Sequence, residues 1–338
     1  MTDPENPAPG DATAFDDVED WKRRRLHAEP RHLVPDRWRE RFSNAGATAK
    51  QRLENLPGAD RFESLLLDAL RGLTGLGTRA AHASVRRDAI LKAYRKHGHD
   101  VRTLRDIRRL HLSDITSVKP RLDLAYVTAS TVQGAGAGLA VSGGQFLAAG
   151  GAGVASAPGV GTVITAMAAD AAAVLVASHR AVAHIAAYYG YDVDEPEERL
   201  FALGVLGVGT AVDATAKYAA YVELHRIVNA LARRQSWQHL NANVITQVVT
   251  KVYAKLGLRL TQRKLAQAVP VAGVVIGAGL NARLLSRIVD DAEHLYRERF
   301  LRERYGATRV ETVPADDCTI PITDIVDAEI VDDTDRGS

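Results

Sequence analysis

The residues of this chain that could do chemistry are a few polar side chains set within apolar sequence. Asp170 ends a long uncharged run, Asn281 lies in the segment GAGLNARLL, and Asp213 follows another apolar stretch. A carboxylate in such surroundings must be paired, protonated or exposed to solvent, because an isolated buried carboxylate is costly. One interpretation is that Asp170, Asp213 and Asn281, with His179 and Arg180, line a polar pocket where helices meet.

The alternative interpretation is that these groups are caps and interhelical hydrogen bonds in a packed core, a common role for single polar residues. Asp213 and Lys217 are four apart on an expected helix, so they can pair with each other. His179 and His184 are five apart, about 140° around a helix, which makes them a poor pair of metal ligands. We therefore predict no catalytic residue, no metal site and no cofactor.

Recognisable catalytic and nucleotide-binding motifs are missing from the chain. It contains no G-x-x-x-x-G-K-[ST], no H-E-x-x-H and no G-x-S-x-G, and its Gly-rich stretches lack the spaced G-x-G-x-x-G pattern. The single cysteine, Cys318, permits neither an intramolecular disulfide nor a cysteine-based zinc site. Arginine-rich runs such as WKRRRLHAEPRH accompany no recognised DNA- or RNA-reading module, so nucleic acid is not an expected partner.

The elements that must position these residues are predicted to be helices. Apolar residues recur with i, i+3, i+4 spacing over residues 62–73, and a second helix is expected over about 80–97, where Gly98 ends it. Pro196, preceded by a capping acid and followed by two more acids, is typical of a helix start. A last helix is expected over about 271–305. Because no alternating β-branched segments occur, the fold class is all-α.

The middle of the chain carries no Asp, Glu, Lys, Arg or His from Leu124 to Ala169. Within residues 131–169, 23 of 39 residues are Gly, Ala or Ser, so the run is long but only weakly hydrophobic. Pro158 and Gly159 should interrupt a helix here. We expect a Gly/Ala-rich helical hairpin with arms near 124–148 and 160–189, at the centre of a multi-helix bundle.

Small residues in this region are spaced so that helices can approach closely. One G-x-x-x-G pair occurs here, Gly134 with Gly138, and a second, Gly273 with Gly277, occurs nearer the C-terminus. The positions that recur every four residues are Ala149, Gly153, Ala157, Gly161, Thr165, Ala169, Ala173 and Ala177. This glycine-zipper pattern fits either the tightly packed core of a soluble protein or a hairpin that sits in or against a bilayer.

Charge divides the chain into blocks that its net charge of +2 conceals. We expect a disordered acidic tail over 1–20, a basic helical extension over 21–103, a helical domain over 104–309 and a disordered acidic tail over 310–338. Apolar residues in the last tail leave room for a short strand or a docking motif; they are Ile320, Ile322, Ile325, Ile330 and Val331. The acidic first residues contain no secretion signal, so the protein is expected to stay inside the cell.

The order of the motifs resembles the EcsC family of bacterial proteins over roughly residues 104–306. The resemblance begins with the Gly/Ala-rich block and Asp170, continues with IAAYYGYDVDEPEERLFALGVLGVGTA, and closes with VPVAGVVIGAGLNARLLSRIVDDAEHLYRERFLRERYG. Besides Asp170 and Asn281, the positions that match the family motifs are Tyr189, Gly190, Asp192, Pro270, Gly273 and Gly277. The resemblance implies no catalytic role for any of them.

The family takes its name from a protein encoded beside an ABC transporter, and the resemblance therefore points to an accessory role. We expect a non-enzymatic protein in the cytoplasm that associates peripherally with the inner face of the cell membrane. Its partner would be an anionic membrane surface or a membrane protein, bound through basic helices and the hairpin. The alternatives are a lipid- or small-molecule-binding enzyme with the polar pocket, and a soluble cytosolic scaffold; the oligomeric state is left open.

Overall fold

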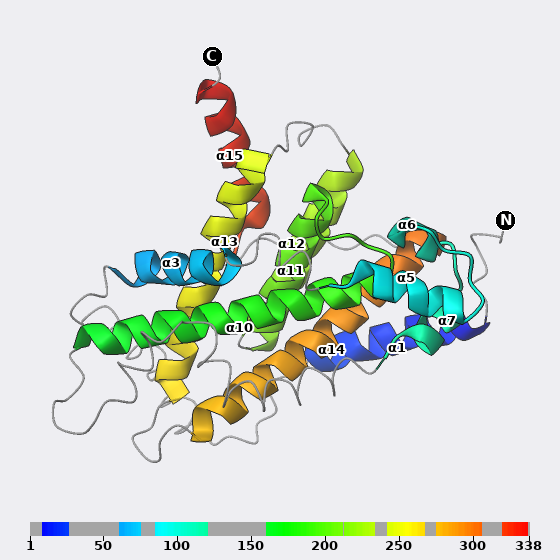
Figure 1. Cartoon of the computed structure of the whole chain (residues 1–338), viewed down its shortest axis with the longest axis horizontal. Coiled ribbons are helices and arrows are strands. Elements are labelled where there is room, and N and C mark those ends of the chain that lie inside the picture. The colour runs from blue at the N-terminus through cyan, green and yellow to red at the C-terminus, as the bar shows by residue number, and fades with distance from the viewer. Residues whose placement is uncertain are drawn as a thin grey trace.

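The computed structural model describes residues 9–26, 61–75, 85–120, 160–211, 213–233, 242–267, 275–305 and 320–336. Within these ranges the chain forms α-helices and no strands, which confirms the all-α multi-helix fold. Figure 1 shows long helices crossing at the centre and shorter ones at the end where the N-terminus lies. The helices are α1 (Pro9–Arg25), α3 (Phe62–Gly75), α5 (Arg87–Lys96), α6 (Leu104–Ile107), α7 (Leu112–Val118), α10 (Val160–Tyr188), α11 (Pro196–Thr210), α12 (Ala214–Arg233), α13 (Ala242–Gln267), α14 (Val275–Tyr305) and α15 (Ile322–Arg336).

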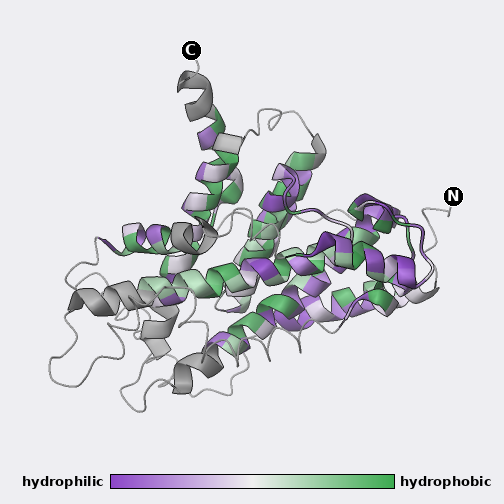
Figure 2. Cartoon of the chain, in the orientation of Figure 1, coloured by the Kyte–Doolittle hydropathy of each residue, from purple (hydrophilic) through white to green (hydrophobic). Residues whose placement is uncertain are grey.

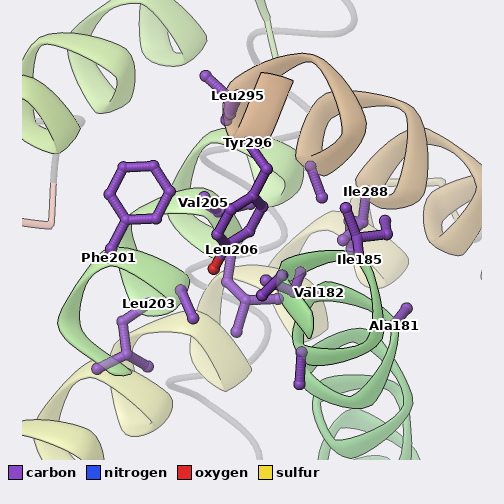
Figure 3. Close-up of a cluster of buried hydrophobic side chains, with 14 of the residues drawn as sticks. Ala181, Val182, Ile185, Phe201, Leu203, Val205, Leu206, Ile288, Leu295 and Tyr296 are labelled. Carbon is purple, nitrogen blue, oxygen red and sulfur yellow. The ribbon is translucent and has the colours of Figure 1, made fainter. Parts of the chain in front are cut away.

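Helix α10 is the central element, and it packs against α3, α11, α13 and α14. It forms the second arm of the expected hairpin, whereas the first arm, residues 124–148, lies outside the described residues. The core between α10, α11 and α14 is apolar and closely packed, as Figure 3 shows for Ile185, Leu206 and Tyr296. α11 is buried over almost its whole length and is therefore a core helix.

One stretch among the described residues, Ala168–Tyr188 of α10, is long and apolar enough to cross a membrane. Within the bundle, 67% of that window is buried. Its apolar side chains therefore already form the protein core, and insertion into a bilayer would require those contacts to break.

Local sequence signals explain where several helices begin and end. Pro196 occupies the first turn of α11 with two acids beside it, where the helix dipole favours negative charge. α5 and α10 both end in a Schellman motif, in which a glycine adopts a positive φ: 88° for Gly98 and 84° for Gly190. Gly98 thus ends α5 as predicted, although α5 begins at Arg87 and residues 76–84 lie outside the described part.

The structure corrects the expectation of disorder at both acidic ends, because residues 9–25 and 322–336 are helical. α1 buries Val18 and Trp21 against the bundle, and α15 buries Ile322 and Val326. Of the apolar residues noted near the C-terminus, Ile320, Ile322 and Ile325 are therefore docked on the bundle, the last two in a helix and not in a strand. Acid composition suggested disorder, but a few apolar residues at helical spacing provide enough burial to order each segment.

Glycines in α11 allow it to pack closely against its neighbours. A Cβ built at Gly209 would lie 2.8 Å from Ile288 Cγ1 and 3.2 Å from Ile288 Cα on α14. At Gly207, two residues earlier, a Cβ would meet nothing within 4 Å. The close approach of α11 and α14 therefore depends on Gly209 and not on Gly207.

We predict that Gly209→Ala lowers the free energy of unfolding by about 1–3 kcal/mol, because overpacking outweighs the better helix propensity of alanine. The matched variant Gly207→Ala should raise stability by up to about 1 kcal/mol. Urea unfolding followed by circular dichroism measures both changes. Equal effects of the two substitutions would contradict the proposed packing.

Candidate functional site: the turn between α10 and α11

The turn from Tyr189 to Glu195 joins α10 to α11 and contains the centre of the family-like motif. Gly190, with its positive φ, lies directly against α6: a Cβ there would be 2.6 Å from the backbone oxygen of Leu104. Arg108 Nε donates a hydrogen bond of 2.9 Å to the Gly190 oxygen, and the Tyr94 hydroxyl donates one of 2.7 Å to the Tyr188 oxygen. The turn is therefore fixed by contacts with its backbone.

Carboxylates of the turn are paired with arginines from the α5–α7 segment. Arg87 bonds Asp192 at 2.9 Å and also pairs with Asp194, while Arg105 donates both of its hydrogen bonds to Glu195 at 3.0 and 3.1 Å. Asp192 additionally accepts the Asp194 backbone N–H at 3.0 Å and so shapes the turn. These contacts attach α5 and α6 to the end of α10.

A buried cluster of charges lies beneath the turn. Glu198, only 3% exposed, accepts two hydrogen bonds from Arg299, at 2.6 and 2.8 Å, and one from Arg108 at 3.2 Å. Both guanidinium groups also lie over the ring of Tyr191, 4.2 and 4.3 Å from its centroid. Burial raises the pKa of Glu198, and the two arginines oppose that shift.

Three carboxylates of α14 are also paired with cations; Asp291 and Glu298 are buried, and Glu293 is partly buried. Glu293 bonds Lys119 and accepts the Tyr189 hydroxyl at 2.6 Å. Glu298 bonds Lys22 of α1 at 2.6 Å, Arg302 at 2.6 Å and the Tyr221 hydroxyl at 2.7 Å. Although burial acts in the opposite direction, these partners lower the pKa of both Glu293 and Glu298.

The third of these carboxylates, Asp291, is fully buried and pairs with Lys217, and Arg25 lies 3.7 Å away. This pairing corrects the sequence-based expectation that Lys217 pairs with Asp213 on its own helix. Asp213 instead caps α12, where its side chain accepts the Ala216 N–H at 2.8 Å. Lys217 pairs with Asp291 because either charge would be more costly to bury without a partner.

The structure brings together two of the five residues of the predicted polar pocket. Asn281 Nδ2 donates a hydrogen bond of 3.1 Å to Asp170 Oδ1, which links α14 to α10. His179 packs edge-on against the Tyr253 ring of α13. Nine residues separate it from Asp170, about 13 Å along a helix. Arg180 and Asp213 are exposed. The Asp170–Asn281 pair therefore acts as an interhelical hydrogen bond.

The family-motif positions fall into two groups. Tyr189, Gly190 and Asp192 all belong to the turn and its contacts. Gly277 lies in the first turn of α14, while Pro270 and Gly273 lie outside the described residues. Within the described ranges, no group of three or more His, Cys, Asp or Glu side chains could hold a metal ion.

Sequence reasoning missed the buried cluster under the turn. Glu198 is one of the two acids that follow Pro196 in the predicted helix start, and no local pattern singles out Arg108 or Arg299 as its partners. A usable signal exists in α14, where the acids at 291 and 298 are seven apart and so lie on the same face of the helix as core residues such as Leu295. The identity of each cation partner depends on tertiary contacts.

Comparisons with known proteins place this arrangement in a family. The model of the EcsC protein family matches residues 143–301, a segment that contains the turn, Glu198 and nearly all of α14. The chain is also 32% identical over 215 residues to the uncharacterized protein YdbA of Bacillus subtilis (strain 168). Residues 143–301 of the chain belong to the EcsC protein family.

The alignment with the Bacillus protein covers 62% of this EcsC-family chain and 66% of the relative, just under two thirds of the relative's length. No solved structure matches the chain. The family match leaves out α1, α3, α5–α7 and α15. The EcsC match thus includes the turn and most of α14, whereas the α5–α7 segment and the helices α1 and α15 lie outside it.

The Schellman glycines at 98 and 190 provide a matched test of how closely α6 packs on the turn. Gly190→Ala should lower the free energy of unfolding by about 3 kcal/mol or more, because it adds a clash with a backbone oxygen to the cost of a positive φ. Gly98→Ala has open space around it and should cost only about 1–2 kcal/mol. Denaturant midpoints of the two variants measure the difference, and equal losses would show that α6 does not pack tightly.

Burial lowers the pKa of His225, which packs on Tyr221 near Glu298 and Lys22, from 6.5 to about 4. Between these pH values the unfolded chain binds a proton at this ring that the folded chain does not, so stability falls as the pH falls. The loss should be about 3 kcal/mol between pH 6.5 and 4.

Urea unfolding at a series of pH values measures this dependence, and His225→Gln should remove its share. His97→Gln is the control, because the His97 ring is exposed. If the free energy of unfolding depends on pH as steeply in His225→Gln as in the unaltered protein, other groups cause the loss of stability in acid.

Proposed function

We propose that this EcsC-family chain is a non-enzymatic accessory protein that binds peripherally to an anionic membrane surface, on the inner face of the cell membrane. The observation that carries the proposal is a basic surface on α5–α7. Its seven exposed members are Arg86, Lys92, Arg95, Lys96, Arg102, Arg105 and Arg109. Two exposed acids, Asp88 and Asp100, lie within the same stretch.

The basic surface is held rigidly by the apolar side of the same segment. α5 buries Ile90, Leu91 and Tyr94 on the opposite side from Lys92, Arg95 and Lys96. Figure 2 shows the resulting concentration of hydrophilic residues at the α5–α7 end of the molecule. A fixed array of cations attracts anionic lipid headgroups without the entropy cost of ordering a flexible tail.

Charge neutralisation within the basic surface is weak. Arg105 pairs with Glu195 and Arg109 with Asp106, but these arginine side chains remain 72% and 85% exposed. Lys92, Arg95 and Lys96 make no ion pair with another described residue. Each basic residue near an anionic membrane contributes about 1 kcal/mol, so the whole surface favours binding by several kcal/mol at low salt.

The expected mode of binding is at the membrane surface, because the apolar residues of α10 are committed to the core. We therefore expect salt to release the protein from membranes and carbonate to strip it completely. Protein that resists carbonate would contradict surface binding and favour insertion of the hairpin over residues 124–189.

We predict that Lys92→Glu/Arg95→Glu/Lys96→Glu reduces binding to vesicles of phosphatidylglycerol and phosphatidylcholine by about tenfold or more. Co-sedimentation with the vesicles measures the bound fraction. The matched control is Lys255→Glu/Arg283→Glu/Arg287→Glu, which changes the net charge equally at exposed positions on α13 and α14. This control should keep most of its binding.

Two results would oppose the proposal. If the unaltered protein stays in the supernatant, a cytosolic scaffold becomes the better description. If both triple variants lose binding equally, net charge and not the α5–α7 surface drives the association.

A further inference from the structure

The C-terminal helix α15 lies against α12 and α13, outside the family-matched part of the chain. Its apolar face follows helical spacing, with Ile322, Ile325 and Val326 buried and Ile320 buried just before it. Asp324 and Asp327 lie on its exposed side. α15 thus docks as an acidic amphipathic helix on two helices of the EcsC domain.

A buried carboxylate of α12 receives the start of α15. Glu223, 3% exposed, accepts hydrogen bonds from the Thr323 backbone N–H at 2.8 Å and from the Thr323 hydroxyl at 2.7 Å. The positive end of a helix dipole favours such an acceptor. Glu223 therefore recognises the beginning of a helix at one defined position.

A second polar contact fixes the register. Glu329 is fully buried and pairs with Lys251 of α13, whose side chain remains 54% exposed. The two contacts on α15, at Thr323 and Glu329, are six residues or about 9 Å apart along the helix. Since covering an apolar face requires no buried acid, these contacts select one particular helix in one register.

The connection between α15 and the rest of the chain is long. The end of α14 is held beside α6 and α1, where Arg304 bonds the Leu110 oxygen at 2.6 Å and Tyr305 bonds Asp11 at 2.5 Å. Figure 1 shows α15 at another part of the molecule, beside α13. The 14 residues from 306 to 319 join them and can extend by roughly 46 Å. A connector of this length does not by itself require α15 to dock on its own chain.

We propose that the face formed by α12 and α13 around Glu223 and Lys251 also receives α15 from a second copy of this chain. Two chains then exchange their C-terminal helices in a symmetric dimer, and each face keeps every contact that it makes within one chain. Exchange leaves the contacts of α15 unchanged, and a long connector adds little entropy cost whether α15 docks on its own chain or on a second copy. The main free-energy cost of exchange is therefore the association of two chains. Protein concentration therefore sets the balance between the two states.

Charge reversal separates exchange from docking within one chain. We make two full-length variants, Lys251→Glu and Glu329→Lys, in separate chains. In each variant, two like charges face each other when α15 docks on its own chain. After the two variants are mixed, exchange restores an opposite-charge pair at both faces. We expect the mixture to form a dimer of one copy of each at least about tenfold more tightly than either variant associates with itself.

Native mass spectrometry identifies the mixed dimer, and sedimentation velocity gives its affinity. The control is the double variant Lys251→Glu/Glu329→Lys in one chain, which restores the pair internally and should behave as the unaltered protein does. A mixture that stays monomeric while the double variant keeps α15 docked would overturn the proposal. In the unaltered protein, exchange predicts dimers that contain one labelled and one unlabelled copy after the two are mixed.

Discussion

The structure depends on one constraint: a carboxylate removed from water needs a cation or a hydrogen-bond donor beside it. α14 places Asp291 and Glu298 in the interior and Glu293 at its edge, and α11 adds Glu198. The partners of these four acids come from α1, the link between α6 and α7, the end of α7, α12 and α14 itself. Apolar packing brings the helices together, and these pairs decide which helix lies beside which.

This constraint gives the family motif a structural meaning. Tyr189 and Gly190 belong to a turn whose backbone and carboxylates are held by the α5–α7 segment. Glu198, in the first turn of the next helix, accepts hydrogen bonds from Arg299. The turn therefore connects the interior charges to the helices that carry the basic surface. Residues that would attract attention as catalytic candidates are already engaged in positioning helices.

Much of the helical framework could be predicted from the sequence, because helix starts, glycine stops and apolar periodicity are local signals. Local signals predict the start of α11 at Pro196, the end of α5 before Gly98 and the end of α14 at Tyr305. The ends of the chain were predicted wrongly, since their acids outnumber the apolar residues that order them. The partner of Lys217 was also out of reach, because Asp291 lies 74 residues further along the chain and only the tertiary fold brings the two together.

The bonds between α1 and α14 join residues that are made far apart in time during synthesis. Arg25 and Asp290 are 265 residues apart, and Asp11 and Tyr305 are 294 apart. At a translation rate of roughly 5–20 residues per second, α1 leaves the ribosome tens of seconds before its binding site exists. For that interval the apolar side of α1, including Trp21, lacks its packing partner, so α1 is synthesised well before it can dock on α14.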